Sequence, residues 1–74
     1  MDSYYRKLLK QQAIEDRCIA EAEWLIDNPN TSIRQLAREF NISKSQVQRD
    51  LNSLKHINDD LYVQCRNILK KHLN

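Results

Sequence analysis

Apolar residues recur at helical spacing in the first third of the chain. They form a stripe whose successive members are three or four positions apart: Ile14, Cys18, Ala22 and Leu25, with Ile19 and Ile26 alongside. Such spacing places side chains on one face of an α-helix. We expect this helix to begin after Ser3, which can act as its N-cap, and to end near Asp27. It should end there because Pro29 disfavours helical geometry at Asn28.

The rest of the sequence predicts three further helices after the turn "NPNT". Ser32 followed by Gln35 fits a capping box for the second helix, and Ser43 followed by Gln46 fits one for the third. An asparagine just before "DDLYVQC" can cap the fourth. These helices are expected to bury the apolar residues Ile33, Leu36, Ala37, Phe40, Val47, Leu51, Leu54, Leu61, Cys65, Ile68 and Leu69.

The composition agrees with an all-helical chain. Among 74 residues there is no glycine and one proline, whereas sheets and hairpins usually need turns that contain glycine. A chain of this length is one domain at most. We therefore predict an all-α fold, a small bundle of about four helices.

The stretch "SIRQLAREFNISKSQVQRDL" fits a helix-turn-helix. Two helices that cross steeply need a small side chain where they touch, and Ala37 provides it. Asn41 stands where the turn commonly needs positive φ, which Asn tolerates better than most residues other than Gly. Val47 then supplies a β-branched side chain that can fill the core. We predict a single helix-turn-helix DNA-binding domain of residues 1–74, with its helix-turn-helix core at residues 32–54.

If Val47 and Leu51 face inward, the opposite side of the third helix is polar. Its side chains suit base edges in the major groove, because Arg and Lys pair with guanine and Gln and Asn pair with adenine. Residues at the start of the second helix can meet phosphate through charge and free N–H groups. The predicted DNA-binding residues are Thr31, Ser32, Arg34, Lys44, Ser45, Gln46, Gln48, Arg49 and Asn52.

Two residues of the third helix allow another interpretation. Gln46 lies at the edge of the polar face and can instead serve the cap. Asp50 is acidic, so we expect it at the surface or paired within the protein rather than on DNA. For the face as a whole the alternative is simple solvation. The net charge is only +2, but residues 31–56 hold five basic and two acidic side chains, and this local excess favours DNA.

Few other residues are candidates for a disulfide, a metal site or a catalytic role. Cys18 and Cys65 lie far apart in the sequence, and we expect both to be buried apolar side chains rather than a disulfide. His56 and His72 have no Cys or acidic partner at metal-ligand spacing, so we predict no metal and no other cofactor. The sequence holds no acid–base pair, nucleophile set or phosphate loop, so we predict no enzymatic activity.

From its first predicted helix to its last, the chain resembles the sporulation stage III D family of bacterial transcriptional regulators. The likeness runs through "DRCIAEAEWLI", "TSIRQLAREFNISKSQVQRDL" and "INDDLYVQCRNILKKHL", roughly residues 16–73, and "REFNISKSQVQRDL" is its most specific part. It implies DNA binding through a helix-turn-helix and control of genes during endospore formation in Gram-positive bacteria. It also implies that Lys44, Ser45, Gln48 and Arg49 lie on the recognition helix. A weaker likeness of "SQVQRDLNSL" to the deoxyribonucleoside-type repressors implies the same style of helix.

Two rival hypotheses remain open. One is a protein-interaction module that binds another protein through the first helix and the aromatic residues Tyr4, Tyr5 and Trp24. The other is a DNA-targeting component of a phage or recombination system, because such proteins share the fold. The polar face of the third helix distinguishes the first rival from a DNA-binding regulator.

Charge and hydropathy limit which binding partners and which cell compartment we expect for this protein. No apolar run approaches the roughly 20 residues of a membrane span, and the start "MDSYYRKLLKQQ" lacks a secretion signal. We expect a cytoplasmic, nucleoid-associated protein whose partner is double-stranded DNA. Arg6, Lys7 and Lys10 could contact phosphate, although a solvated helix face is the preferred interpretation. Monomer and homodimer both remain open, with the monomer favoured because the family likeness implies it and no long heptad seam is visible.

Overall fold

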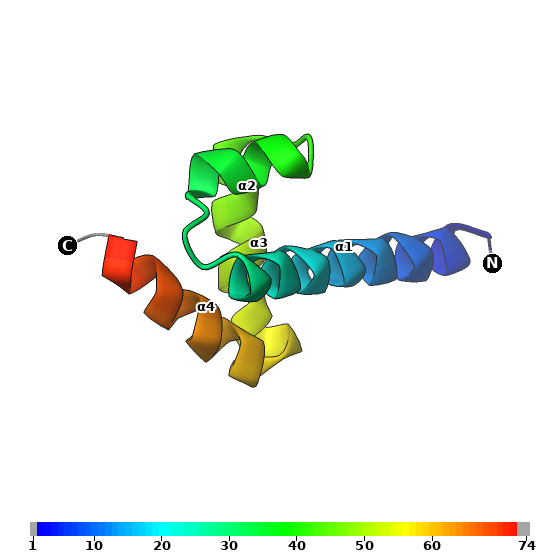
Figure 1. Ribbon diagram of the computed structural model, residues 1–74. Helices are drawn as coiled ribbons and strands as arrows, with labels where there is room; N and C mark the ends of the chain where they lie inside the picture. The colour runs from blue at the N-terminus through cyan, green and yellow to red at the C-terminus, as the bar shows by residue number, and fades with distance from the viewer. Residues whose placement is uncertain (1, 73–74) are drawn as a thin grey trace.

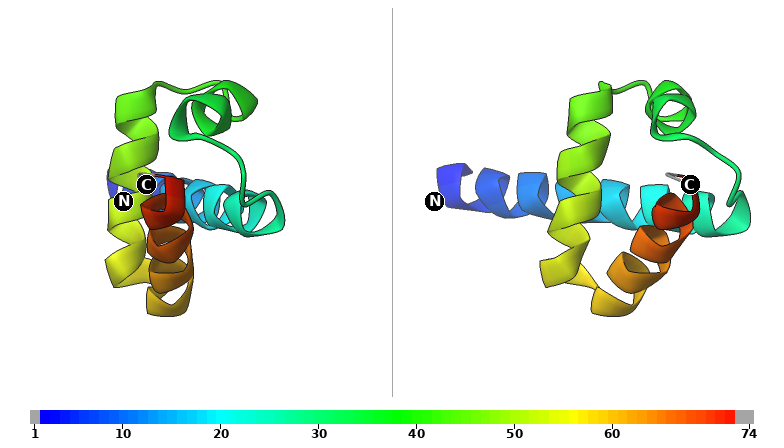
Figure 2. Two further views of the ribbon diagram at one scale, coloured as in Figure 1. Left: turned by 60° about the vertical axis from the view of Figure 1, so that its left-hand side comes forward. Right: turned by 90° about the vertical axis from the view of Figure 1, so that its left-hand side faces the viewer.

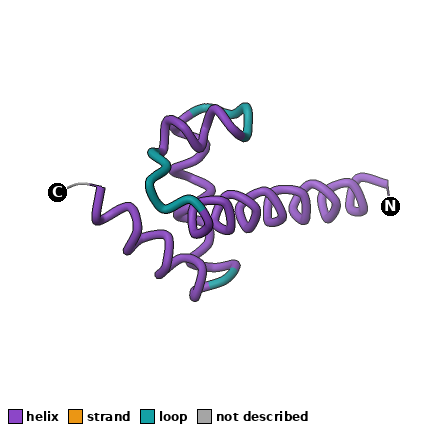
Figure 3. Tube along the Cα trace, viewed as in Figure 1, coloured by secondary structure: helices purple, strands orange, loops and turns teal. Residues whose placement is uncertain are grey.

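The computed structural model describes residues 2–72, and it describes side chains from Arg6 to Lys71. Within this range every regular element is a helix, which confirms the all-α prediction. The helices are α1 (Asp2–Asp27), α2 (Ile33–Glu39), α3 (Lys44–Ile57) and α4 (Asp59–His72). Figure 1 shows α1 as a long rod that crosses α3, and Figure 3 shows that short loops join the helices. None of the described helices has the length and apolarity that crossing a membrane requires.

The core lies where the second half of α1 meets the other helices. α1 packs on α3 and α4, and α3 also packs on α2 and α4, so α3 is the central helix. Burying each large aliphatic side chain stabilises such a core by roughly 1.5–3 kcal/mol. The fully or nearly fully buried apolar side chains are Cys18, Ala22, Leu25, Leu36, Ala37, Val47, Leu51, Leu54 and Cys65. The expectation that both cysteines are free and buried is confirmed.

α1 departs from its prediction at its amino-terminal side. It ends at Asp27, as Pro29 predicts, but it begins at Asp2. Ser3 therefore lies inside the helix, and the prediction that it caps α1 is wrong. Ile14, expected in the buried stripe, is 39% exposed. The reason is that the amino-terminal half of α1 projects beyond the other helices, so its face has nothing to pack against (Figure 1).

The turn between α2 and α3 is fixed by its backbone hydrogen bonds. Asn41 has φ 54°, the positive value predicted for it. Its N–H donates to the carbonyl of Arg38 (3.2 Å), and the N–H of Ile42 donates to that of Ala37 (3.0 Å). These two bonds form a Schellman motif, which needs a left-handed residue after the C-cap Phe40. The α2–turn–α3 unit is consistent with the predicted helix-turn-helix.

Side-chain caps start the three shorter helices. Ser32 and Gln35 form both bonds of the predicted capping box at α2. At α3, the Ser43 hydroxyl accepts from the N–H of Gln46 at 3.1 Å. Asn58 Oδ1 accepts from the N–H of a residue in the first turn of α4 at 3.2 Å. Such caps satisfy N–H groups that would otherwise lack a partner and typically contribute about 1 kcal/mol each.

Candidate DNA-binding surface

α3 has one buried side and one exposed side. Val47 and Leu54 are fully buried and Leu51 is 6% exposed, which fixes the rotation of the helix about its axis. The opposite side is exposed and polar, and we call five of its residues the outer face: Lys44, Ser45, Gln48, Arg49 and Asn52. Lys55 and His56 continue this exposed side toward the end of α3. The inward phase predicted for this helix is therefore confirmed, and the five predicted residues form one continuous polar surface.

Gln46 lies apart from the outer face. Its side-chain Nε2 donates to Asp50 Oδ1 at 2.9 Å, one turn further along α3. Its backbone N–H serves the Ser43 cap, but its side chain does not complete a capping box, so that expectation is wrong. Gln46 is half-buried. A contact between its amide and DNA would require the bond to Asp50 to break.

The start of α2 offers fewer free N–H groups than the sequence suggested. The N–H of Thr31 donates to the carbonyl of Asn28 at 2.9 Å, and the N–H of Ser32 donates to Gln35 Oε1 at 2.9 Å. The expectation that these two groups are free for phosphate is therefore wrong. Arg34 is exposed in the first turn of α2, so its charge is available.

A bidentate ion pair joins α1 to the inner side of α3. Arg17 Nε donates to Asp50 Oδ2 at 2.8 Å, and Nη2 donates to Oδ1 at 3.0 Å. Asp50 is 2% exposed, so it is an intramolecular partner as expected, but it does not lie at the surface. Bidentate pairs of this kind restrict the relative orientation of the two side chains and are stronger than neutral hydrogen bonds. The pair therefore fixes the position of α3 against α1.

A second carboxyl group, Glu21, is buried beside this pair. It is 0% exposed, and as a carboxylate it has no hydrogen-bond donor for either oxygen. Burial, reinforced by the hydrogen bond and charge of Asp50, raises the pKa of Glu21 to about 9. Glu21 is therefore protonated at neutral pH and can donate to Asp50. Burial alone would raise the pKa of Asp50, but hydrogen bonds from Arg17, Glu21 and Gln46 outweigh it and lower that pKa.

The cluster also places three potential metal ligands together. Ligand atoms of Cys18, Glu21 and Asp50 lie within 4.8 Å of one another. However, both Asp50 oxygens already accept hydrogen bonds from Arg17 and Gln46. Burial raises the pKa of the Cys18 thiol to about 12, which disfavours the thiolate that binds metal. The chemistry of these groups thus fits a hydrogen-bonded network better than a metal site.

This network was not predicted from the sequence, although the sequence contains one signal of it. Glu21 follows Cys18 by three residues and precedes Leu25 by four, so it lies in phase with the buried stripe of α1. A buried carboxylate needs a partner. Arg17, four residues earlier on the same helix, places its Nε 3.9 Å from Glu21 Oε2. No pattern in the sequence pairs Glu21 with Asp50, because the two residues meet only when α1 crosses α3.

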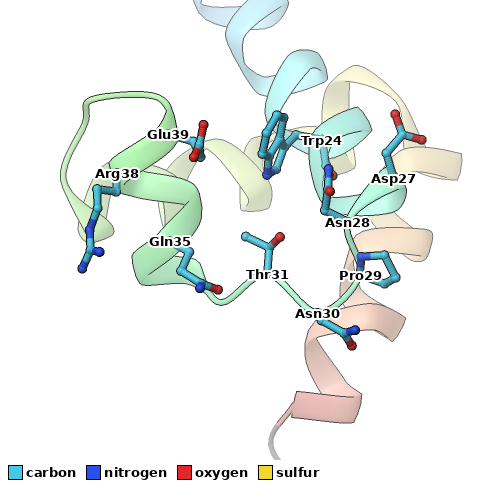
Figure 4. Close-up of a pocket in the computed structure, with 9 residues that line it drawn as sticks. All are labelled: Trp24, Asp27, Asn28, Pro29, Asn30, Thr31, Gln35, Arg38 and Glu39. Carbon is cyan, nitrogen blue, oxygen red and sulfur yellow. The ribbon is translucent and has the colours of Figure 1, made fainter.

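An open pocket lies between the end of α1 and α2, away from the outer face. Figure 4 shows Trp24 at one wall, with Thr31 between it and Gln35. Trp24 is 37% exposed, and Asn28 Nδ2 donates to its carbonyl at 3.0 Å. The residues that line the pocket are Trp24, Asp27, Asn28, Pro29, Asn30, Thr31, Gln35, Arg38 and Glu39.

Comparison with known proteins identifies a family. The model of the family described as stage III sporulation protein D matches residues 11–74. The chain is 37% identical over 60 residues to stage III sporulation protein D of Bacillus subtilis (strain 168). That alignment covers 80% of this chain but 63% of the relative, so the chain spans less than two thirds of the relative's length. No solved structure matches the chain significantly. Since the family match covers most of the sequence, this chain belongs to the stage III sporulation protein D family.

Proposed function

We propose that this protein is a sequence-specific DNA-binding regulator of transcription that acts on genes of endospore formation. The observation that carries the proposal is the outer face of α3, which is polar, exposed and opposite the buried side of the same helix. Such a face can enter the major groove, which is about 12 Å wide and admits one helix. Membership of a sporulation protein family supports the biological role.

Each residue of the outer face has a contact that its chemistry favours. Arg49 can bind the O6 and N7 atoms of guanine in a bidentate manner, and Gln48 can bind adenine at N6 and N7. Ser45 and Asn52 lie on the same face and are short enough to reach base edges only when the helix is deep in the groove. Lys44, at the first position of α3, can reach phosphate as a point charge.

Residues near α2 would bind the phosphate backbone and fix the orientation of the protein. Arg34 supplies a charge, and the hydroxyl of Ser32 keeps its proton for a phosphate oxygen because it only accepts within the capping box. Thr31 can contribute its hydroxyl in the same way. Gln46 would hold α3 in position through Asp50 and would reach DNA only indirectly.

The hypothesis of a protein-interaction module is less well supported. Tyr4 and Tyr5 belong to the first turn or two of α1, and their side chains lie outside the part of the chain whose side chains are described. Trp24 follows them by about 20 residues, which is roughly 30 Å along the helix. The three aromatic residues therefore do not form one surface. Family membership, in turn, favours a regulator over a DNA-targeting component of a phage or recombination system.

A selection of bound duplexes from a random pool tests the proposal. We expect one sequence motif to be enriched, with affinity that falls steeply as salt rises, because phosphate contacts release counterions. A pool that stays random after repeated selection would contradict sequence-specific binding. Sedimentation of the free protein and of its complex with the enriched duplex would decide between a monomer and a homodimer.

A further inference from the structure

The amino-terminal half of α1 projects beyond the bundle. α1 has 26 residues, which is about 39 Å of helix, and the molecule is 49 Å long but only 24 and 18 Å across. Among the side chains of α1 that the structure describes, the first buried one is Cys18, and residues 6–14 are all exposed. Figure 1 shows this segment extending away from the other helices. Residues 6–14 make no contribution to the core, so their surface is free for another use.

This projecting segment is strongly basic. Arg6, Lys7 and Lys10 are exposed, and the only acidic residue among positions 2–14 is Asp2. We call these three residues the basic strip. Three cations within about one and a half turns of helix create a local positive field that suits a polyanion.

The ion pair of Arg17 shows which way the basic strip faces. The Arg17 guanidinium binds Asp50, so Arg17 lies on the side of α1 that faces α3. Lys10 precedes Arg17 by seven residues and Arg6 precedes it by eleven, close to two and three full turns of about 3.6 residues. Lys7 lies next to them, three residues before Lys10. The side of α1 that contacts α3 therefore continues past α3 as the basic strip.

The projecting segment and α2 lie on opposite sides of α3. The right-hand view of Figure 2 shows α1 crossing α3, with the amino-terminal half of α1 on one side and α2 on the other. A helix in the major groove has a phosphate strand on each side of it, about 12 Å apart. Arg34 is exposed on α2 and, under the proposed function, would contact one of these strands. Lys10 and Arg6 lie about 10 and 16 Å along α1 from Arg17, a reach comparable with the groove width.

We propose that the basic strip binds the phosphate backbone that flanks the α3 site, on the strand opposite the one that α2 contacts. This inference rests on the proposed DNA-binding function. The match to the stage III sporulation protein D family begins at residue 11. The basic strip thus lies outside the matched region and adds phosphate contacts to those of the helix-turn-helix. It raises affinity without adding sequence preference, because phosphate contacts carry no base information.

A second copy of the chain fits this surface less well. Two basic strips brought together would repel each other. Leu8 and Leu9, which are 51% and 50% exposed, are adjacent in sequence and point about 100° apart on the helix, so they do not form an apolar seam. DNA carries negative charge along its whole length and therefore attracts the basic strip.

The test removes the three charges together. The variant Arg6→Gln/Lys7→Gln/Lys10→Gln keeps good helix formers at all three positions. Its affinity for the selected duplex and for a random duplex is measured by fluorescence anisotropy over a series of salt concentrations. Each lost phosphate contact should reduce the slope of log K against log salt by about 0.9. We expect the slope to fall by about 2–3, with equal loss on both duplexes. The charge-conserving control Arg6→Lys/Lys7→Arg/Lys10→Arg should keep the parent slope.

The length of the duplex provides a second control. One duplex ends at the edges of the selected site, and another extends it by half a helical turn, about 5 base pairs, on each side. The triple variant should lose more affinity on the extended duplex than on the short one, because the extended duplex holds more of the flanking phosphates. Equal slopes for parent and variant on the extended duplex would overturn the role of the basic strip. So would a parent that sediments as a dimer and a triple variant that sediments as a monomer.

Different results would contradict the DNA-binding function and the role of the basic strip. A parent protein that shows no salt-dependent binding to any duplex would overturn the DNA-binding function itself. A parent that binds the selected duplex, loses preference for it in Arg49→Ala, and keeps its full salt slope in the triple variant would overturn only the basic strip.

Discussion

Replacing Glu21 by glutamine should stabilise the protein, and increasingly so as the pH rises. Glu21 is completely buried next to Asp50, and its pKa is raised from an ordinary value near 4.5 to about 9. The variant Glu21→Gln has nearly the same shape, and its amide can donate to Asp50 without holding a titratable proton. The substitution therefore removes the cost of keeping a carboxyl group protonated inside the fold.

The magnitude and sign follow from proton linkage. Between about pH 4.5 and pH 9 the folded protein holds one more proton at Glu21 than the unfolded chain does. The free energy of unfolding therefore falls as the pH rises through this window, and Glu21 contributes fully only below about pH 4.5. At about 1.4 kcal/mol per pH unit, the difference between Glu21→Gln and the parent should reach roughly 3 kcal/mol at pH 7. It should keep growing until about pH 9.

Urea denaturation followed by circular dichroism at about pH 5, 7 and 8.5 measures this difference directly. Subtracting the parent from Glu21→Gln at each pH cancels the titration of groups that do not interact with Glu21. The matched control is Glu23→Gln, which changes an exposed carboxylate two residues away and should give a small difference at every pH. A difference for Glu21→Gln that does not change with pH would refute the buried, protonated state of Glu21.

Two further predictions concern the α2–turn–α3 unit. Val47→Asp places an unpaired carboxylate where the side chain is fully buried, so cooperative thermal unfolding and DNA binding should both be lost, whereas Gln48→Asp on the exposed side should melt like the parent. A Val47→Asp protein with the parent's melting curve would contradict the inward phase of α3. Asn41→Gly should raise the free energy of unfolding by about 0.5–1 kcal/mol, because φ is 54° there, and Asn41→Val should lower it. Equal stabilities in urea for the two Asn41 variants would argue against a left-handed residue at the turn.

Local signals in the sequence predicted most of the fold. Pro29 predicted the end of α1, Ser32 and Ser43 predicted the starts of α2 and α3, and Asn41 predicted the positive φ of the turn. Each of these depends on a residue and its immediate neighbours. The rotation of α3 also followed from a local pattern, because the apolar residues of a helix that packs on its neighbours lie on the packed side.

Features that depend on how helices cross were not predictable in the same way. The projection of α1 left Ile14 exposed although it belongs to an apolar stripe, since a stripe does not reveal where its packing partner ends. The partner of Asp50 could not be identified, because Arg17 lies 33 residues away in the sequence. The bond from Gln46 to Asp50 is different, because it joins residues four apart within α3 and the sequence spacing already allowed it.

The central claim is that the outer face of α3 reads bases, and Arg49 tests it most directly. The affinities of the parent, Arg49→Ala and Arg49→Lys should be measured at one salt concentration on the selected duplex and on a random duplex. We predict that Arg49→Ala costs about 1–3 kcal/mol on the selected duplex and clearly less on the random one. Arg49→Lys should also lose preference for the selected duplex, because lysine keeps the charge without the bidentate fork. Equal losses of Arg49→Ala on both duplexes would show that Arg49 contacts only phosphate and would contradict base recognition by this residue.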